Sequence, residues 1–333
     1  MSELKSQIYP WQKDQWDYVQ RLLTSETLPH AVLLTGPSGV GKHEFANNLA
    51  ASIFCENNLD SGSACGACKR CNLYQANTYP DFIKLSINEE KETISVDEVR
   101  DLIAKLHLTR HFDTYKIALI EHADTMNNNA ANALLKTLEE PPDKTLIILV
   151  ASAALELPAT IRSRCQTLTL TAPTHEEARS WLNEISSDVD WVPLLRVSHD
   201  APLQALKYHE TELLDQRISV IKGFLELFEG NSNPVEISAR VESVPLILCF
   251  QWIQAVIIDL LRIKGSENPI TLENPDFYRS LLALAPRMQV PLLLEYWEIV
   301  MERKKIFDKS LNRRLFVESL LIHCHKLALK HQI

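Results

Sequence analysis

The 333-residue sequence predicts an α/β protein in which a parallel sheet is covered by helices on both faces and is followed by an all-helical region. Two short apolar runs, Lys116–Ile120 and Leu146–Ala151, show no alternation, as expected for strands buried on both faces. Helical patterns lie between such runs, and this order is typical of a parallel sheet. Beyond about residue 171 the strand signals stop. We therefore expect the sheet in the first half and helices in the remainder.

The elements of the first half alternate along the chain. Residues 12–30 carry apolar side chains at helical spacing and end just before the first apolar run, Ala31–Thr35. The further elements expected here are a helix from Glu44 to Phe54, a strand at Asp81–Ser86, an amphipathic helix at Ile94–Leu106 and a helix at Ala130–Leu138 that stops before Pro141 and Pro142.

The second half shows helix signals and almost no strand signals. Thr174-His-Glu-Glu177 has the spacing of a capping box at the start of a helix. Long apolar helices are expected at 218–228, 245–262, 290–307 and 311–330. The helix at 245–262 is apolar nearly all round, which in a soluble protein indicates a bundle centre or a subunit interface. We therefore divide the chain into residues 1–171, a small helical domain at 172–212 and an all-helical domain at 213–333.

The composition is that of a soluble globular protein with two or three domains. A formal net charge of −9 argues against a general nucleic-acid coat and against a membrane-surface protein. No apolar run approaches the length of a membrane span, and Met1–Trp11 lacks the basic and apolar segments of an export signal. We therefore expect a cytoplasmic protein without membrane contact. Thiols stay reduced in that compartment, which favours a metal site over disulfides where cysteines cluster.

The segment from Ala31 to His43 has the order strand, glycine-rich loop and helix, which is typical of a phosphate-binding loop. Gly36, Gly39 and Gly41 would let backbone N–H groups turn toward a polyphosphate, and the N-terminus of the next helix would face the same anion. Lys42 would reach the terminal phosphates. The alternative is a glycine-rich turn that begins a helix without binding a ligand.

Two positions depart from the pattern of a nucleotide hydrolase. A hydrolase uses Ser or Thr after the loop lysine to bind Mg²⁺, whereas this chain has His43. It also needs a metal-binding carboxylate, followed by a water-activating carboxylate, at the end of a neighbouring strand. Glu121 could supply the first, but His122 occupies the place of the second. The sequence therefore argues against hydrolysis and leaves open whether Lys42 still binds ATP or ADP.

Four of the seven cysteines lie close together and include two CxxC steps: Cys55, Cys65, Cys68 and Cys71. This spacing predicts a tetrahedral Zn²⁺ site, and four protein ligands make it structural because no coordination position stays open. An iron–sulfur cluster uses a similar spacing, but the further cysteine expected shortly downstream is absent. Free thiols are the other alternative. The remaining cysteines are expected to be ordinary buried residues: Cys165, Cys249 and Cys324.

The connection Leu157–Gln166 follows the strand at 146–151 and carries Arg162 and Arg164. An arginine at a subunit edge can neutralise charge that develops on a phosphate bound by the neighbouring subunit. Judged from spacing alone, a surface arginine in a weak salt bridge is the more frequent case. These residues by themselves leave both roles open.

Several motifs, in order along almost the whole chain, resemble the bacterial clamp-loader branch of the AAA+ proteins. They are Asn132-Ala-Leu-Leu-Lys-Thr-Leu-Glu-Glu-Pro-Pro142, Ile161-Arg-Ser-Arg-Cys165, the four-cysteine insertion and the late helix that begins at Leu311. Within this branch the chain is more similar to the delta prime family of DNA polymerase III than to the ATP-hydrolysing gamma/tau family. The resemblance implies an AAA+ domain with a RecA-like parallel sheet and a zinc-binding insertion, then a small helical lid domain and an all-α collar domain.

The departures from the AAA+ motifs favour delta prime over gamma/tau. A gamma/tau chain would carry Lys-Ser or Lys-Thr in the loop and Asp-Glu after the strand, where this chain has Lys42-His43 and Glu121-His122. The family's sensor arginine is also absent from the segment that contains Pro202. The motif that survives is Ser163-Arg164-Cys165. In this family it implies that Arg164 is an arginine finger offered to the ATP site of the adjacent gamma/tau subunit.

The resemblance also implies the partners. It implies a hetero-pentameric assembly with gamma/tau and delta subunits, which opens the sliding clamp and places it on primed DNA. The chain itself would lack ATPase activity while belonging to a DNA-directed DNA polymerase, a nucleotidyltransferase holoenzyme. Contacts with duplex DNA would be shared among subunits and made mostly to phosphate.

Two other functions stay open at this point. An active AAA+ ATPase of the gamma/tau type is compatible with Lys42 and Glu121. A zinc-dependent nucleic-acid-binding module is compatible with Lys69 and Arg70 among the cysteines, although the acidic net charge and the few nearby aromatic residues argue against it. Residues 301–333 hold eight Lys/Arg against three Asp/Glu and form either a solvated face or a contact with a neighbouring subunit.

Overall fold

A computed structural model describes residues 8–87, 93–152, 157–211, 213–229, 233–266, 272–306 and 313–330. The chain forms two compact units. The N-terminal unit comprises Met1–Ile185 with Ala201–Gln204, and the C-terminal unit comprises Ser186–Asp200 with Ala205–Ile333. The division passes through residues 172–212, so a separate lid domain there stays a prediction.

The N-terminal unit contains one sheet of five parallel strands in the order β2-β3-β4-β1-β5. The strands are β1 (Ala31–Thr35), β2 (Phe82–Leu85), β3 (Lys116–Ile120), β4 (Thr145–Val150) and β5 (Gln166–Thr169). Four of them confirm the strands that the sequence predicts. The edge strand β5 was not expected, because Leu168 is its only apolar residue and its pairing with β1 defines it.

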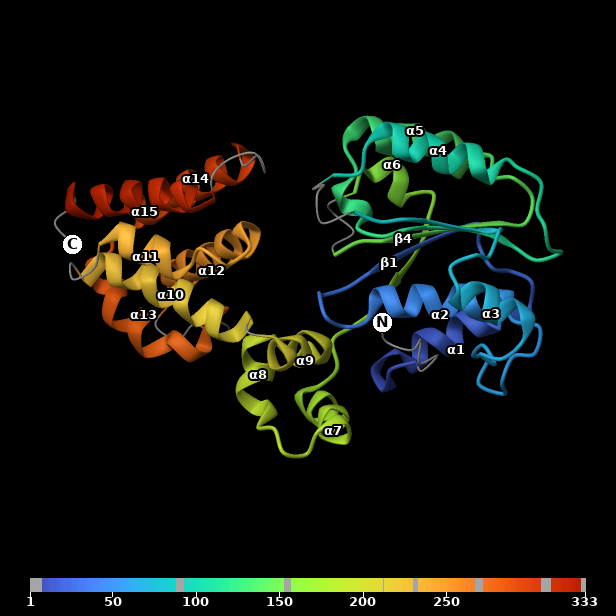
Figure 1. Ribbon diagram of the computed structural model, residues 1–333, viewed down its shortest axis with the longest axis horizontal. Coiled ribbons are helices and arrows are strands. Elements are labelled where there is room, and N and C mark those ends of the chain that lie inside the picture. Colours follow the sequence, from blue (N-terminus) through green and yellow to red (C-terminus); the bar gives the residue numbers. More distant parts are fainter. Residues whose placement is uncertain are drawn as a thin grey trace. The chain divides into compact units, whose positions relative to one another are not determined.

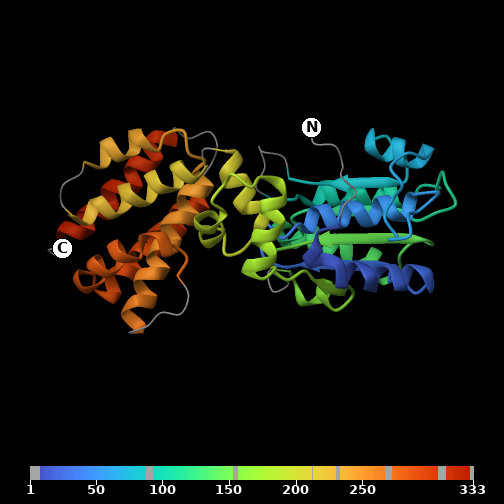
Figure 2. The ribbon, with the colours of Figure 1, turned by 90° about the horizontal axis from the view of Figure 1, so that it is seen from below.

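Alternate side chains of the central strands point to opposite faces of the sheet, and both sets are buried. Leu146 and Ile148 of β4 pack in one core, and Ile147 and Leu149 pack in the other. One face is covered by α1 (Lys13–Thr24), α2 (Lys42–Phe54) and α3 (Lys69–Gln75), and the other by α4 (Val96–Leu106), α5 (Asn128–Glu139) and α6 (Ala159–Arg162), as Figures 1 and 2 show. This is the AAA+ arrangement of a parallel sheet with helices on both faces.

Side-chain caps set the starts of the two helices α4 and α5. Ser95 caps α4 in a capping box: its hydroxyl accepts from the Glu98 N–H, and the Glu98 carboxylate accepts from the Ser95 N–H at 2.9 Å. The helix therefore begins at Val96 and not at Ile94, which instead bridges to Met126. The Asn127 side chain accepts from the third N–H of α5 at 2.8 Å.

The predicted capping box of α7 (His175–Ile185) is present. The Glu177 carboxylate accepts from the Thr174 N–H at 2.8 Å, and the Thr174 hydroxyl accepts from the Glu177 N–H at 3.3 Å. Two further short helices follow, α8 (Trp191–Val197) and α9 (Pro202–Glu210). None of the helices within the described ranges is long and apolar enough to cross a membrane.

The C-terminal unit is helical throughout its described residues. Its helices beyond α9 are α10 (Leu213–Glu229), α11 (Pro234–Arg240), α12 (Leu246–Gly265), α13 (Tyr278–Leu284), α14 (Val290–Ile306) and α15 (Arg313–Lys330). The nearly all-apolar α12 packs against α10, α13 and α14, and Phe250, Ile257 and Leu260 are among its buried side chains. The prediction of a bundle centre for this helix is therefore confirmed.

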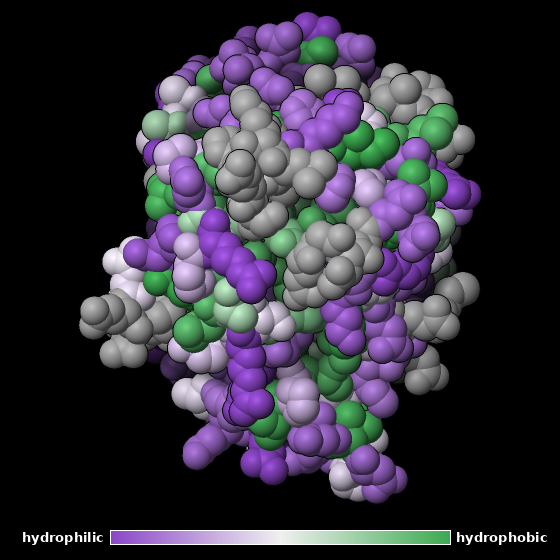
Figure 3. Space-filling view, turned by 90° about the vertical axis from the view of Figure 1, so that its left-hand side faces the viewer, coloured by the Kyte–Doolittle hydropathy of each residue, from purple (hydrophilic) through white to green (hydrophobic). Residues whose placement is uncertain are grey.

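The surface of the C-terminal unit mixes hydrophilic and hydrophobic residues on the face that Figure 3 shows. Exposed apolar side chains of this unit include Tyr278, Leu282, Val290, Leu294 and Leu315. Two stretches of the basic segment 301–333 lie outside the described residues: 307–312, with the predicted helix start at Leu311, and 331–333.

Candidate functional site

The glycine-rich loop connects β1 to α2 in the form that the sequence predicts. Gly39 and Gly41 have φ angles of 77° and 87°, in the left-handed region that favours glycine. Gly36 allows a close approach, because a Cβ there would lie 2.1 Å from the carbonyl oxygen of Leu170. Helix α2 begins at Lys42, directly after the last of these glycines. The backbone thus makes a tight glycine turn between β1 and α2, and phosphate binding by this loop stays a prediction.

The ammonium group of Lys42 folds back onto its own loop. Its Nζ donates to the carbonyl oxygens of Gly36 at 2.7 Å and Pro37 at 2.8 Å, and the residue is only 6% exposed. Burial lowers the pKa of Lys42, although the charges of Asp124 and Glu44 partly oppose this effect. Two of the three N–H donors of the ammonium group are therefore used by carbonyl oxygens of the loop itself.

The segment before α1 closes over the other side of the loop. A short 3₁₀ helix, η1 (Pro10–Gln12), brings two side chains onto the loop carbonyls. Trp11 Nε1 donates to the carbonyl oxygen of Val40 at 2.9 Å, and Gln12 Nε2 donates to those of Val40 at 2.8 Å and Gly41 at 2.9 Å. Sequence reasoning missed this contact, whose only local signal is an aromatic and a polar residue just before a helix.

Aromatic rings extend this cover. Tyr9 and Trp11 stack at a centroid distance of 4.9 Å, and Trp181 of α7 lies edge-on to both at 5.3 Å. A Cβ added at Gly41 would lie 2.6 Å from the Tyr9 ring. Burial, followed by the charge of Glu44, raises the pKa of Tyr9 to about 12. The loop is therefore packed against the protein's own side chains.

Glu121, the candidate metal-binding carboxylate, is paired with side chains of the chain itself. Its Oε1 lies 2.9 Å from Lys84 Nζ and 3.4 Å from His43 Nδ1, and its side chain is 11% exposed. Burial alone would raise the pKa of Glu121, but hydrogen bonds from His43 and Lys84 outweigh burial and lower it. Lys84, which sequence reasoning missed, therefore pairs its positive charge with the candidate metal-binding carboxylate.

His122 lies beside this pair in the left-handed region, with φ 55°. Its ring centroid is 4.9 Å from that of His43. Burial and the neighbouring His43 lower the pKa of His122, which favours the neutral imidazole. The structure thus brings His43 and His122, two positions at which the sequence departs from the hydrolase motifs, together with the candidate carboxylate Glu121.

The turn expected to lack a sensor arginine contains two consecutive left-handed residues, His199 and Asp200, with φ angles of 53° and 59°. His199 Nε2 lies 3.0 Å from Glu273 Oε2 within the C-terminal unit. Pro202 then begins α9. At this turn the chain presents a histidine and a carboxylate, and the sequence from Ser198 to Leu206 holds no arginine.

Arg164 lies two residues after the end of α6, and its side chain is 33% exposed. Its Nη1 donates to the carbonyl oxygen of Thr160 at 2.8 Å and contacts the Ser163 hydroxyl at 3.4 Å. Its Nη2 donates to the carboxylate of Glu139, the last residue of α5. None of these contacts is with the glycine loop, so the guanidinium is held at a surface apart from the chain's own lysine.

The four predicted metal ligands come together as the sequence indicates. The sulfur atoms of Cys55, Cys65, Cys68 and Cys71 all lie within 4.8 Å of one another. Backbone N–H groups already point at three of these sulfurs: Cys65 N at Cys55 Sγ (3.2 Å), Cys68 N at Cys65 Sγ (3.4 Å) and Cys71 N at Cys68 Sγ (3.4 Å). Around tetrahedral Zn²⁺, with bonds of about 2.3 Å, the sulfurs would lie about 3.8 Å apart. The cluster therefore fits zinc after a small contraction.

The thiols outside this cluster differ from those in it. The N–H groups of Ala67 and Cys68 lower the pKa of Cys65 to about 6, whereas burial raises the pKa of Cys165 to about 11. Cys249 and Cys324 are buried as expected, while Cys165 is partly exposed. Within the cluster the directions differ: burial at Cys68 is outweighed by backbone N–H groups, which lower its pKa, whereas burial raises the pKa values of Cys55 and Cys71. The clustered thiols are therefore distinguished from the others by their metal-ligand spacing.

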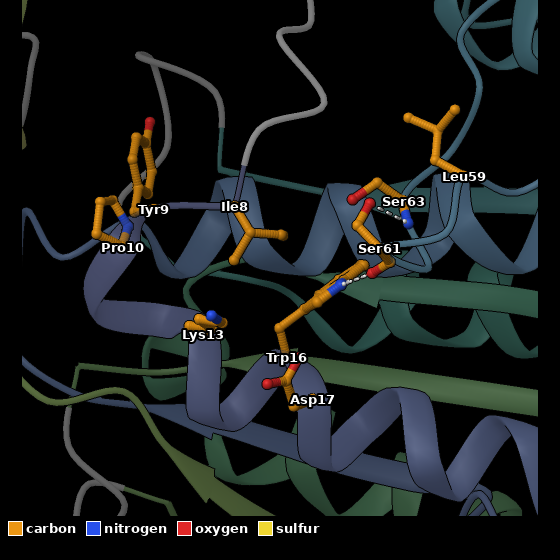
Figure 4. A pocket seen from close by; sticks show the side chains of 9 residues that line it. All are labelled: Ile8, Tyr9, Pro10, Lys13, Trp16, Asp17, Leu59, Ser61 and Ser63. Atoms are coloured by element: carbon orange, nitrogen blue, oxygen red, sulfur yellow. Dashed lines mark hydrogen bonds between the residues drawn. The ribbon is translucent and has the colours of Figure 1, made fainter.

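An open pocket of about 410 Å³ lies beside the cysteine insertion, between α1 and residues 59–63 (Figure 4). Trp16 closes one side of it by donating from Nε1 to the carbonyl oxygen of Ser61 at 2.9 Å. Lys13 and Asp17 are its charged lining residues. The pocket shares no residue with the glycine loop, the Arg164 connection or the four cysteines.

Comparison with known families gives two matches that lie in different halves of the chain. The family model described as DNA polymerase III, delta subunit, matches residues 11–174. The model described as DNA polymerase III, delta subunit, C terminal, matches residues 211–326.

Individual relatives are similar over different lengths. The chain is 34% identical over 321 residues to DNA polymerase III subunit delta prime of Pseudomonas aeruginosa, and the aligned region covers 95% of this chain and 96% of the relative. It is 28% identical over 320 residues to subunit delta prime of Escherichia coli K12, and the aligned region covers 94% of each chain. Similarity to the E. coli tau subunit, 32% over 159 residues, covers 48% of this chain and 24% of the relative. The delta prime relatives thus match both units, and tau matches about half of the chain.

Proposed function

The chain belongs to the delta prime family of DNA polymerase III subunits, and on that premise we propose that it is a non-hydrolysing member of the clamp loader. It assembles with gamma/tau and delta subunits into a hetero-pentamer that places the sliding clamp on primed DNA. Similarity to relatives named tau and gamma supports a common origin of these subunits, as expected for neighbours in one ring. The C-terminal helical unit serves as the collar of this assembly.

The absence of hydrolysis by this chain is supported by the contacts of three side chains. Lys42 donates to two carbonyl oxygens of its own loop. Glu121 is neutralised by Lys84 at 2.9 Å, and His43 offers no hydroxyl for Mg²⁺. Phosphoryl transfer depends on positioned metal and phosphate, so a site that lacks the metal hydroxyl and pairs its carboxylate internally loses most of its catalysis.

Arg164 is the side chain that this chain contributes to ATP hydrolysis at the neighbouring site. The single observation that carries this proposal is that its guanidinium lies on a partly exposed connection and makes no contact with the chain's own glycine loop. A planar guanidinium suits the charge that develops on a transferring phosphoryl group. Arg164 therefore acts in trans, on ATP bound by the adjacent gamma/tau subunit.

The test is ATP turnover by the complex reconstituted with gamma/tau and delta subunits. Arg164→Ala is expected to slow ATP hydrolysis at the neighbouring site by about 10³-fold or more. The DNA-stimulated ATPase rate of the whole complex should therefore fall by the fraction of turnover that this one site contributes. Arg162→Ala is the matched control, because Arg162 is a neighbouring arginine with no side-chain partner among the described residues. Wild-type turnover with Arg164→Ala would refute the finger assignment.

The same preparation tests the second candidate, an active ATPase of the gamma/tau type. The retained Lys42 and Glu121 favour it, and it predicts steady hydrolysis by the isolated chain that Lys42→Ala abolishes. Our proposal predicts no turnover by the isolated chain. The contacts of Lys42 with Gly36 and Pro37 favour the absence of turnover.

We further propose that Cys55, Cys65, Cys68 and Cys71 bind a structural Zn²⁺. Four thiolates saturate a tetrahedral ion, so the metal would organise the insertion and would take no part in catalysis. The clustering of the sulfurs within 4.8 Å supports this assignment over free thiols. Metal analysis that found iron, or less than about half an equivalent of zinc, would contradict it.

A further inference from the structure

We propose that Glu139 is a positioning residue for Arg164, holding the guanidinium in the orientation in which it meets the neighbour's phosphate. This inference rests on the proposed function of Arg164 and assigns a role to a second side chain. Glu139 is the last residue of α5, and Arg164 follows α6. The two residues are 25 positions apart in the sequence, and the helices to which they are attached pack against each other.

The backbone around Arg164 gives its side chain little support. Helix α6 has only four residues, and Ser163 ends it. A long side chain on such a connection would sample many rotamers and would lose that freedom at the moment of binding. Two acceptors remove this freedom in advance: the carbonyl oxygen of Thr160, at 2.8 Å from Nη1, and the Glu139 carboxylate, which accepts from Nη2.

The anchor supplied by Glu139 is the firmer of the two, because α5 is fixed to the sheet. Leu134 and Leu138 of this helix are buried in the core beneath it. Thr160, by contrast, belongs to the same short segment as Arg164 and is exposed. The Glu139 carboxylate therefore connects the Arg164 guanidinium, through their hydrogen bond, to a helix that is packed on the sheet.

The contacts leave the guanidinium able to bind a phosphate. Arginine has five N–H donors, and the contacts with Thr160, Ser163 and Glu139 use at most three. The remaining donors can reach an oxygen of the neighbour's nucleotide without loss of the Glu139 contact. Because the side chains of Arg164 and Glu139 are 33% and 51% exposed, the ion pair contributes little to folding stability. Its role is to orient the guanidinium of Arg164.

The experiment uses the reconstituted complex and measures the Arg164-dependent rate, defined as wild-type ATP turnover minus that of Arg164→Ala. Glu139→Ala is expected to lower this rate about tenfold, with an unchanged KM for ATP, because an arginine finger acts in the transition state. Glu139→Gln keeps an oxygen acceptor and is expected to stay within about threefold of wild type. The double variant E139A/R164A should match R164A alone, since both changes act through one guanidinium.

Glu140→Ala is the matched control, because Glu140 is the next residue, is exposed and has no side-chain partner among the described residues. If E139A equals wild type while R164A is slow, the role of Glu139 is refuted and the finger stands. If R164A equals wild type, the finger itself is refuted. A rise in ATP turnover with E139A would show that the carboxylate restrains Arg164. A double variant slower than R164A would show that Glu139 acts through another group. Either result would overturn the positioning role.

Discussion

At the scale of single residues, Lys84 and Glu121 form an ion pair at the candidate metal-binding carboxylate. Lys84 lies on β2, and Glu121 directly follows the neighbouring strand β3. Their side chains meet at 2.9 Å, and His43 adds a second contact with Glu121 at 3.4 Å. Burial pushes the pKa of Glu121 upward, but the two hydrogen bonds hold it below its usual range. A carboxylate with a lowered folded-state pKa stabilises the fold above its unfolded pKa, and this stabilisation is lost as pH falls through the folded-state value.

We predict that Lys84→Met lowers the stability of the N-terminal unit by about 1 kcal/mol at pH 7, because Glu121 stays buried with only His43 as a partner. The difference from wild type should shrink as pH falls through the folded-state pKa of Glu121, which its two hydrogen bonds hold below the usual value of about 4.3. Urea unfolding at pH 7 and at about pH 3, followed in the N-terminal unit, measures it. Lys105→Met is the control, because Lys105 is exposed and its ammonium has no partner among the described residues. An equal loss of unfolding free energy at both pH values would contradict a stabilising ion pair between Lys84 and Glu121.

At the scale of elements, the cysteine insertion joins short segments that have little core of their own. Cys68 caps α3, with its sulfur accepting from the Cys71 N–H, and Cys71, which lies in α3, is the buried one of the four clustered cysteines. The insertion is also tied to α1 by the hydrogen bond from Trp16 to Ser61 at 2.9 Å. A metal ion would hold the two ends of this segment together where side-chain packing is sparse.

We predict that Cys68→Ser lowers bound zinc from about one equivalent to less than half, because one of four thiolate ligands is lost. Hydrogen exchange should then rise in residues 55–75 before it rises in the sheet. Cys165→Ser is the control, since Cys165 lies outside the cluster and burial raises its pKa to about 11. Full zinc occupancy in Cys68→Ser, or an equal loss in Cys165→Ser, would argue against the four-thiolate site.

At the scale of the whole molecule, the hydrophobic cores follow the two units. The sheet has one core on each face, and the helices α10 to α15 enclose another. Leu49 of α2 and Leu260 of α12 are both fully buried, each in the core of a different unit. The units are therefore expected to respond separately to the loss of core volume.

We predict that Leu49→Ala and Leu260→Ala each destabilise their own unit by about 2–5 kcal/mol through the lost contacts and the cavity that remains. Hydrogen exchange of the slowest amides should accelerate in the sheet for the first variant and in α12 for the second, each leaving the other unit unchanged. Each variant serves as the control for the other. Equal acceleration in both units with either variant would show that they unfold as one.

Several features could be predicted from the sequence because they depend on short stretches of chain. The buried strands β1, β3 and β4 follow from unbroken apolar runs, and the left-handed glycines follow from the spacing of the loop. Three thiols of the cysteine cluster are held together by two CxxC steps, whereas Cys55, at the end of α2, joins them through the fold of the insertion. The edge strand β5 escaped prediction because an exposed strand carries no apolar run.

Only the tertiary structure decided which side chains meet across the sequence. Lys84 reaches Glu121 because β2 pairs with β3, Gln12 reaches Gly41 because η1 folds over the loop, and Glu139 reaches Arg164 because α5 packs beside α6. The sequence by itself determined the sheet, the loop and the altered hydrolase motifs. The partners of the charged side chains depend on strand order and helix packing, because residues 25 to 37 positions apart meet only when the chain between them is folded.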